Sequence, residues 1–293
     1  MLFPHQPDFA RAAAKSFRLM QEAAFDFDET DVRVYDHSFY LLFMAWYFQL
    51  TGDPLSIQLL KDRYALIEWH LDNAGAGGFG PQTAGIRSHN PYMHLLEALL
   101  TAFRSTGDDY WLTQARSIGD LFLTRLFDRD KRVVFEFLNP DWSPTTEGRV
   151  EIGHQLEWPT LLFELHDLTG GPELLAAADS LYQFALRYGF ENDAVIDAVN
   201  AEGAPLDRKR LLWGQLEAAR HFAIRGKRFQ DEASRFRASA QWRRVHEHFF
   251  HANGWTWYNR ISPEGTPVEE PSVARLLYHV VTATADSGCS DDH

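Results

Sequence analysis

A chain of 293 residues with 45% hydrophobic side chains is long enough to bury a large core, and its composition is not that of a disordered chain. Lys and Arg number 28 against 41 Asp and Glu, and the net charge of −13 argues against binding to nucleic-acid backbones or anionic membrane surfaces, so a neutral substrate is expected. The single cysteine, Cys289, excludes an internal disulfide and argues against a thiolate metal site or a cysteine nucleophile, which fits a reducing, cytoplasmic setting.

Apolar residues recur three and four positions apart in about ten segments, and this spacing predicts α-helices. In chain order, the expected helices are Pro7–Ala24, Asp36–Leu50, Pro54–Asn73, Pro91–Ser105, Asp109–Leu126, Gly153–Leu168, Pro172–Tyr188, Arg208–Ile224, Gln230–His251 and Val273–Ala285. The most apolar run, Phe39–Tyr47, is shorter than the roughly 20 residues that a membrane-spanning helix needs. The sequence therefore predicts a soluble, mainly α-helical protein.

Short turns that contain glycine join these helices in pairs, because glycine suits the end of one helix and proline the first turn of the next. The expected turns are Thr51–Pro54, Thr106–Asp108, Thr169–Pro172 and Arg225–Lys227. Their glycines recur at intervals of about 60 residues, a period expected of a repeated two-helix unit.

The other connections are long, and this asymmetry predicts that function gathers on the side of the long loops. They are Ala74–Asn90, Phe127–Ile152, Gly189–Asp207 and Ala252–Ser272, with hairpin-like stretches at Val133–Leu138, Ala194–Leu206 and Trp255–Val268. Helices that follow a long loop are more apolar around their circumference than their partners, and a helix that is apolar all round is typically an inner helix. We therefore expect an all-α fold, a closed α/α toroid of inner and outer helices, with an open solenoid as the alternative.

Each expected inner helix carries polar or aromatic groups in its first turns, where they would meet at one mouth of the toroid. They are Tyr35 and His37, Asn90 and His94, His154 and Glu157, Trp213 and Glu217, and Tyr278 and His279. A single histidine of this kind is more often a satisfied core residue than a catalyst, but several on equivalent helix ends favour a shared pocket. Glu97, Glu157 and Glu217 suit the orientation of a histidine, and Trp257 suits either core packing or the apolar face of a sugar ring.

Several motifs together resemble one enzyme family. They are YDHSFYLL from Tyr35, NPYMHLLEALL from Asn90, DWSP from Asp141, GRVEIGHQLEW from Gly148, LLWGQLEA from Leu211, GWTWYNRISPEG from Gly254 and LLYHVV from Leu276. This set is similar to the N-acylglucosamine 2-epimerase family, which includes cellobiose 2-epimerases and mannose isomerases. The resemblance implies an (α/α)6 barrel and proton transfer beside a sugar carbonyl without a metal or other cofactor.

The resemblance also implies roles for individual residues. His154 and His279 match the general acid/base pair, and His94 matches a third histidine that assists ring opening or substrate positioning. Arg149 matches an arginine that polarises the substrate. Tyr35, Trp213 and Glu217 match pocket positions of the family. Apart from this match, we also expect His37, Asn90, Glu157 and Trp257 to contact the sugar. Such chemistry suits imidazole, which titrates near neutrality, and a cation that stabilises an enediolate.

The same resemblance indicates that one helix pair is missing before Pro7, since six hairpins need twelve helices and about ten are visible. We expect a single catalytic domain at 1–285, truncated at its N-terminus, and a polar tail at 286–293. The expected partner is a mannose-like or N-acylglucosamine-like sugar, bound by a monomer or a homodimer.

Three other hypotheses stay open at this point. A glycoside hydrolase on a similar barrel needs two carboxylates that flank the scissile bond, whereas histidines occupy the expected helix mouths. A metal-dependent protein would use His94 with Glu97 and His154 with Glu157. The last alternative is a barrel fragment that binds sugar without turnover.

Overall fold

The computed structural model describes residues 7–22, 34–73, 85–252 and 256–287. The chain folds into two compact units. The N-terminal unit comprises Met1–Asp120 with Asn139–Asp141, and the C-terminal unit comprises Leu121–Leu138 with Trp142–His293. The single domain expected at 1–285 stays a prediction.

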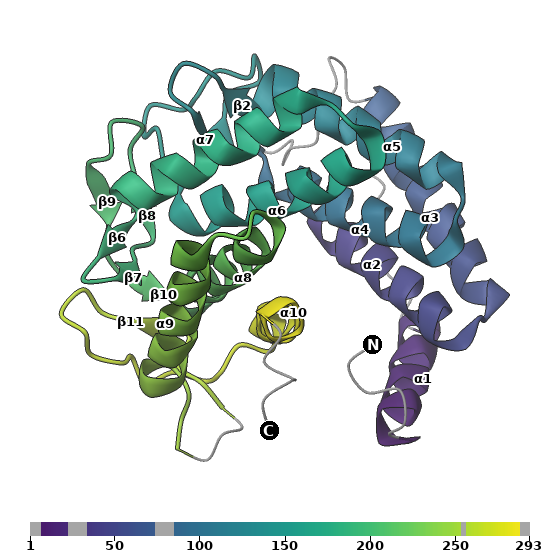
Figure 1. Cartoon of the computed structure of the whole chain (residues 1–293). Helices are drawn as coiled ribbons and strands as arrows, with labels where there is room; N and C mark the ends of the chain where they lie inside the picture. Colours follow the sequence, from purple (N-terminus) through teal and green to yellow (C-terminus); the bar gives the residue numbers. More distant parts are fainter. Residues whose placement is uncertain (1–6, 23–33, 74–84, 253–255, 288–293) are drawn as a thin grey trace. The chain divides into compact units, whose positions relative to one another are not determined.

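The N-terminal unit is built from α-helices and one short strand (Figure 1). They are α1 (Pro7–Glu22), α2 (Val34–Thr51), α3 (Pro54–Asn73), α4 (Asn90–Thr106) and α5 (Asp109–Leu121), with the short strand β1 (Arg87–Ser88) before α4. Helix α2 packs against both α3 and α4. Because α2 and α4 are buried over most of their circumference, they have the character predicted for inner helices.

Two of the expected turns between helices lie in this unit. Gly52 and Gly107 have φ angles of 70° and 68°, and a Cβ added at either position would meet nothing within 4 Å. The N–H of Gly107 donates to the carbonyl of Phe103, which closes the end of α4. The left-handed backbone, rather than a lack of space, therefore favours glycine at these turns.

The C-terminal unit repeats the same hairpin (Figure 1). It contains a π-helical turn (Phe122–Leu126), α6 (Ile152–Thr169), α7 (Pro172–Tyr188), α8 (Leu212–Arg228), α9 (Glu232–His248), a 3-10 turn (Ala274–Leu276) and α10 (Leu277–Ser287). Helix α8 packs against α6 on one side and α10 on the other, whereas α7 covers α6 and α9 covers α8. Alternate helices thus form an inner row and an outer row, as the distribution of apolar residues predicted.

Short strands lie in the long connections. They are β2 (Phe127–Asp128), β3 (Val133–Val134), β4 (Phe137–Leu138), β5 (Val150–Glu151), β6 (Phe190–Glu191), β7 (Ala194–Val195), β8 (Ala198–Val199), β9 (Pro205–Asp207), β10 (Arg210–Leu211) and β11 (Arg260–Ile261). Strands β5, β8 and β9 form a three-stranded antiparallel sheet, and β10 pairs with β11. Since β5 leads directly into α6 and β10 into α8, these sheets fix where the inner helices begin.

Three sequence expectations need correction here. Helix α8 begins at Leu212 rather than Arg208, because the residues before it form β10. Gly226 lies inside α8 rather than in a turn, and the chain reverses after Arg228, where Gln230 has a φ of 54°. Val133–Leu138 is not a hairpin by itself, since β3 pairs backward with β2.

The end of the chain differs from expectation as well. Helix α10 includes Asp286 and Ser287, which had been assigned to the polar tail, and the rest of that tail lies outside the described residues. No helix among the described residues has the length and hydropathy to cross a membrane.

Candidate active site

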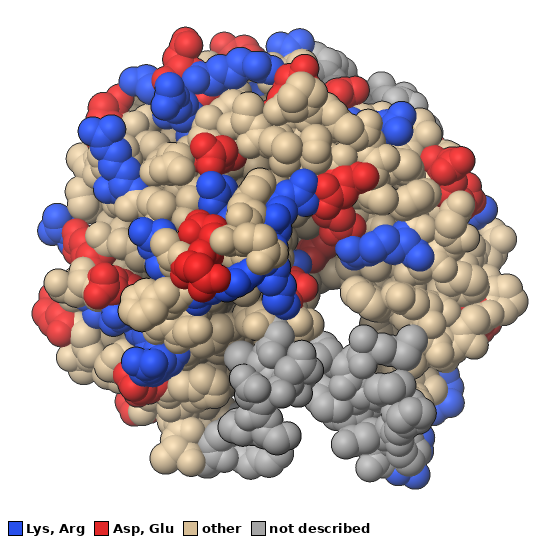
Figure 2. Space-filling model, in the orientation of Figure 1, with Lys and Arg blue, Asp and Glu red and all other residues tan. Residues whose placement is uncertain are grey.

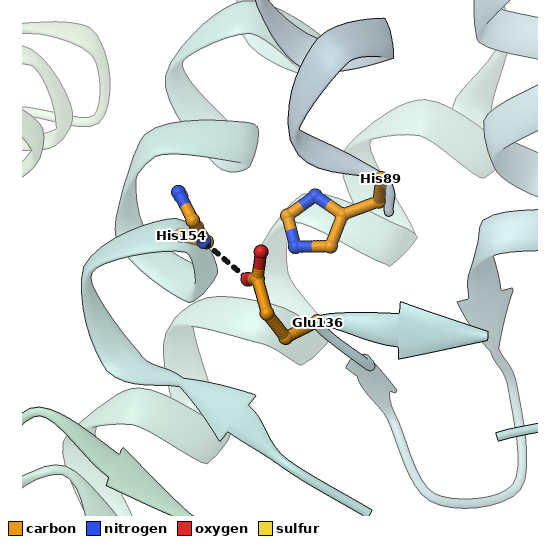
Figure 3. A group of neighbouring side chains, drawn as sticks. All are labelled: His89, Glu136 and His154. Atoms are coloured by element: carbon orange, nitrogen blue, oxygen red, sulfur yellow. Dashed lines mark hydrogen bonds and ion pairs between the residues drawn. The ribbon is translucent and has the colours of Figure 1, made fainter. Parts of the chain in front are cut away.

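His154 stands at the start of α6 and is held by a carboxylate from the preceding loop. Its Nδ1–H donates to Oε2 of Glu136 at 2.7 Å (Figure 3). Glu151 lies 3.6 Å from the same nitrogen. Both His154 and Glu136 are buried. A hydrogen bond at Nδ1 fixes the ring and leaves Nε2 as the nitrogen available for chemistry.

Burial alone would lower the pKa of His154. The charges of Glu136, Glu151 and Glu157 outweigh that effect and raise the pKa to about 9. The imidazole of His154 is therefore a cation at neutral pH. Beside it, burial together with the charge of Glu136 raises the pKa of Glu151.

The loop that carries Glu136 is fastened to α6 by a glutamine side chain. Gln155 accepts a hydrogen bond from the N–H of Val134 at 3.1 Å and donates to its carbonyl at 2.9 Å. On α8, Gln215 makes the same pair of bonds with Val195, at 2.9 and 2.7 Å. Each glutamine side chain thus makes the pair of backbone hydrogen bonds that a neighbouring strand would make. This fixes the acidic residue two positions after each valine, which is Glu136 after Val134 and Asp197 after Val195.

Asp197 is the acidic residue that Gln215 places, and it binds two cations. Arg149 donates through Nη2 to Asp197 and through Nε to Glu151, the latter at 2.9 Å, while the ammonium of Lys209 lies 3.0 Å from Asp197. Lys209 also donates to Asp207 at 2.7 Å. Arg149, the predicted substrate-polarising residue, is thereby fixed at the start of α6.

His279 on α10 has a carboxylate partner of the same kind. Its Nδ1–H donates to Oε1 of Glu217 on α8 at 2.7 Å, and Glu217 is fully buried. The other oxygen of Glu217 lies 3.5 Å from Arg220, whose Nε donates to Asp286 at 2.6 Å. Tyr278 packs edge-on against His279, with the ring centroids 4.8 Å apart.

Trp213 at the start of α8 brings the two histidines into one group. Its ring centroid lies 4.7 Å from that of His154 and 5.8 Å from that of His279. A Cβ at Gly153 would lie 2.2 Å from the Trp213 ring, so only glycine at this position permits the close approach. The sequence prediction that His154, Trp213 and His279 lie together is consistent with this geometry.

Glu157 lies on the same side of the unit. Glu157, Glu217 and His279 each offer a potential ligand atom, and these atoms lie within 4.8 Å of one another. This group could hold a cation, and Glu136 and His154 belong to a further candidate group. His154 donates through Nδ1 to Glu136, and its pairing with Glu157 at a metal stays a prediction.

The N-terminal unit contains a histidine group of its own. Nδ1 of His94 on α4 lies 3.5 Å from Glu97, and the ring packs against Tyr35 at 5.2 Å and Phe39 at 4.7 Å between centroids. His37 is fully buried on α2. Asn90 is the first residue of α4, and its N–H donates to Ser88.

Trp257 lies in the hydrophobic core of the C-terminal unit. It packs into a cluster with Leu212, Leu216 and Ile261, which is the packing alternative considered for it. Its role as a sugar contact stays a prediction.

Sequence reasoning missed Glu136, Asp197 and Arg220. For Glu136 and Asp197 the sequence did contain a signal, because Gln-Leu-Glu recurs at Gln155 and Gln215. Each of these glutamines binds a valine, and an acidic residue lies two positions after that valine. Periodicity could not reveal them, because both lie in loops.

Lys and Arg side chains lie among Asp and Glu side chains on the face drawn in Figure 2. The expectation, drawn from the net charge, of a partner that is not a polyanion stays a prediction.

Comparisons with known proteins agree with this arrangement. Residues 11–283 match the family described as N-acylglucosamine 2-epimerase (GlcNAc 2-epimerase). The chain is 28% identical to a D-mannose isomerase of Thermobifida fusca, over 85% of this chain and 68% of that protein. It is 31% identical to a mannose-6-phosphate isomerase of Rhizobium meliloti (strain 1021), over 66% of this chain and 53% of that protein, and thus spans about half the length of the second relative.

Solved structures show the same fold. A cellobiose 2-epimerase from Spirochaeta thermophila DSM 6192 matches with a TM-score of 0.81 at 20% identity, over 96% of this chain and 80% of that one. A D-mannose isomerase crystal structure matches with a TM-score of 0.79 at 20% identity, over 88% of this chain and 72% of that one. The fold class is therefore that of the (α/α)6-barrel enzymes, and the chain belongs to the N-acylglucosamine 2-epimerase family.

Proposed function

We propose that this chain is a sugar isomerase or 2-epimerase in which His154 and His279 transfer protons through an enediol intermediate. The observation that carries the proposal is the pair of buried imidazoles on either side of Trp213, each bound through Nδ1 to its own carboxylate. Family membership supports the reaction class, and the similarity to a D-mannose isomerase supports mannose as the first substrate to test.

The two histidines have different surroundings, and these suggest different roles. His154 carries a proton at neutral pH because its pKa is about 9, so it suits the acid that protonates the carbonyl oxygen of the open-chain sugar. His279 has one carboxylate partner, which Arg220 shares, and suits the base that removes the proton from C2. Trp213 offers a flat apolar face between them for the sugar chain.

The same proton transfers give both products. Removal of the C2 proton by His279, with proton donation from His154 to the carbonyl oxygen, leaves a neutral enediol. Return of a proton to C1, with loss of the proton on the C2 hydroxyl to His154, gives a ketose. Return of the proton from His279 to C2, after the enediol has turned its opposite face toward that histidine, with loss of the proton on the C1 hydroxyl to His154, gives the epimer. Arg149, fixed by Asp197 and Glu151, is the candidate cation that stabilises developing negative charge on oxygen.

A panel of sugars tests the reaction class. Purified protein is incubated with D-mannose, D-glucose, N-acetyl-D-mannosamine and cellobiose, and the products are separated by chromatography. We expect one of these to give its ketose or its C2 epimer. Absence of both products from every sugar, with ligand-induced shifts in Tm retained, would instead support a sugar-binding protein without turnover.

The same assay tests the absence of a metal requirement. Because each histidine has a carboxylate at Nδ1 that can hold it without a cation, we expect turnover to survive exhaustive treatment with EDTA. Loss of turnover that Mn²⁺ or Zn²⁺ restores would contradict this and would point to Glu157, Glu217 and His279 as ligands.

A further inference from the structure

Helix α10 presents His279 from its first turn but has little buried surface of its own. Among its side chains only His279 and Ala283 are buried, and Leu277 and Val281 are 52% and 49% exposed. Apolar packing of α10 therefore contributes little to the placement of His279. The segment that leads into the helix has a correspondingly larger part in it.

That segment is bound by the side chain of Asn259, which is buried. Nδ2 of Asn259 donates to the carbonyl of Pro271 at 2.8 Å and to Oε1 of Glu270 at 3.2 Å. Oδ1 accepts from the N–H of Val273 at 2.8 Å. The carbonyl of Val273 in turn accepts from the N–H of Leu276, the last residue before α10. One amide thus holds the segment at successive points up to the start of the helix.

The backbone of Asn259 is bonded to α8. Its carbonyl accepts the N–H of Leu212, the first residue of α8, at 3.0 Å. The strand that follows Asn259, β11, pairs with β10, which leads directly into α8 (Figure 1). Trp213 is the next residue of α8. Asn259 therefore joins the start of α8, where Trp213 lies, to the segment that leads to His279.

The preceding repeat uses the same place for a different purpose. The N–H of Ile152, the first residue of α6, donates to the carbonyl of Asp197 at 3.0 Å, as that of Leu212 does to the carbonyl of Asn259. The side chain of Asp197 binds the cations of Arg149 and Lys209. At Asn259 a neutral amide stands in this place and binds backbone groups instead.

The bonds to the segment need an amide. A carbonyl requires a donor and an N–H requires an acceptor, and the side chain of Asn offers both. Pro271 has no N–H, so its carbonyl is the group that it can offer. An ionised aspartate at position 259 would still accept from Val273, but it would have no donor for Pro271 and would repel the carboxylate of Glu270.

A serine hydroxyl makes a further tie between the same two stretches. Oγ of Ser272 accepts from the N–H of Trp257 at 3.1 Å and donates to the carbonyl of Trp257 at 2.7 Å. In the two preceding repeats this pair of bonds comes from Gln155 and Gln215 on the inner helices. The residue after His279 is Val280, which cannot form them. The segment before α10 thus supplies bonds that the helix itself does not.

We propose that Asn259 is a positioning residue that sets where His279 lies relative to Trp213. Its carbonyl fixes the start of α8 and its side chain fixes the entry to α10, so that one residue governs the separation of the two rings, whose centroids are 5.8 Å apart. Displacement of a reacting group by an ångström costs much of the rate. The proposal rests on the proposed function for the use of His279 in turnover.

The test is Asn259→Asp in the full chain, assayed with the sugar that wild type converts. The change keeps the size of the side chain and removes the donor to Pro271. We expect kcat to fall at least about tenfold, because His279 is displaced. KM should change much less, since Trp213 still offers its face to the sugar.

Asn200→Asp is the matched control. Asn200 follows β8, and its Oδ1 accepts from the N–H groups of Glu202 at 3.1 Å and Ala204 at 2.8 Å. An aspartate can accept both bonds, so the same chemical change in a neighbouring loop should leave kcat, KM and Tm near the wild-type values.

A fluorine NMR signal at Trp213 reports the geometry without turnover. The full chain is labelled with fluorotryptophan, and the signal is assigned by its loss in Trp213→Phe. His279→Ala removes the neighbouring ring and shows how the signal responds when that ring is absent. We expect the signal to move or broaden in Asn259→Asp and to keep its wild-type position in Asn200→Asp.

Three outcomes decide the proposal. A merely structural Asn259 would lower Tm while kcat of the folded protein and the Trp213 signal stay at wild-type values, and that result overturns the proposal. If Asn259→Asp does not fold, Asn259→Ser removes the amide without adding a charge and decides by the same two readouts. A moved Trp213 signal in a protein that converts no sugar would refute the proposed function and leave the positioning role standing.

Discussion

At the scale of single residues, the site contains side chains packed so closely that an added methyl group would overlap with a neighbour. Gly153 is the sharpest example, since a methyl group there would lie 2.2 Å from the ring of Trp213. Gly153→Ala must therefore displace Trp213 from its place between His154 and His279. We expect kcat/KM to fall at least about tenfold, since misplacing a positioning group by an ångström costs that much or more.

The matched control for this change is Gly214→Ala, on the first turn of α8. A Cβ there would have its nearest neighbours at 3.7 and 3.8 Å, which is ordinary contact. Steady-state kinetics should show little effect for Gly214→Ala. Equal activity of Gly153→Ala and wild type would show that the placement of Trp213 does not matter for turnover.

At the scale of helices and strands, sequence patterns predict elements best where the ends are marked chemically. The bounds expected for α3 and α7 are those observed, because each begins at a proline and ends beside polar residues or glycine. The start of α8 was misplaced because Leu211 continues the apolar spacing of the helix although it belongs to β10. Glu136 and Asp197 escaped detection because only tertiary contacts, through Gln155 and Gln215, bring them to the site.

Gly226 shows how a sequence rule fails for a physical reason. Glycine inside a helix costs up to about 1 kcal/mol relative to alanine, so propensity alone predicts that Gly226→Ala stabilises the protein. A Cβ at Gly226 would, however, lie 2.7 Å from Cγ and 3.1 Å from N of Arg235 on α9. We therefore expect Gly226→Ala to lower Tm, as measured by calorimetry, because α9 must move outward. A raised Tm would contradict the close packing of α8 and α9.

At the scale of the whole molecule, two buried histidines set opposite limits on stability. The folded-state pKa of His154 is about 9, above the ordinary value of 6.5. The contribution of His154 to the free energy of unfolding is therefore complete below pH 6.5 and is lost as pH rises through 9. That contribution is on the order of 3 kcal/mol. His221, buried against Phe163 and Tyr182, has a pKa lowered to about 3 by burial and by the charges of Arg225 and Arg220.

Below pH 6.5, His221 takes up a proton in the unfolded chain but stays neutral in the folded protein. Its contribution to the free energy of unfolding is therefore complete above pH 6.5 and is lost as pH falls toward 3. Together the two groups predict a maximum of Tm near pH 6.5. Two variants separate them in a series of thermal melts. The stability difference between wild type and Glu136→Gln should be largest below pH 6.5 and shrink toward pH 9, and His221→Leu should flatten the acid side. A Glu136→Gln difference that grows with pH would contradict the raised pKa of His154.

The central claim is that His154 and His279 move the proton at C2 of a sugar, and deuterium incorporation measures this directly. The sugar that reacts in the panel is incubated in deuterated water, and the C2 proton signal is followed by NMR. We predict incorporation by wild type, a loss of at least about a hundredfold in His154→Ala and His279→Ala, and no change in His166→Ala, whose histidine binds the Gly171 carbonyl at the far end of α6. Undiminished incorporation in either of the first two variants would contradict the account.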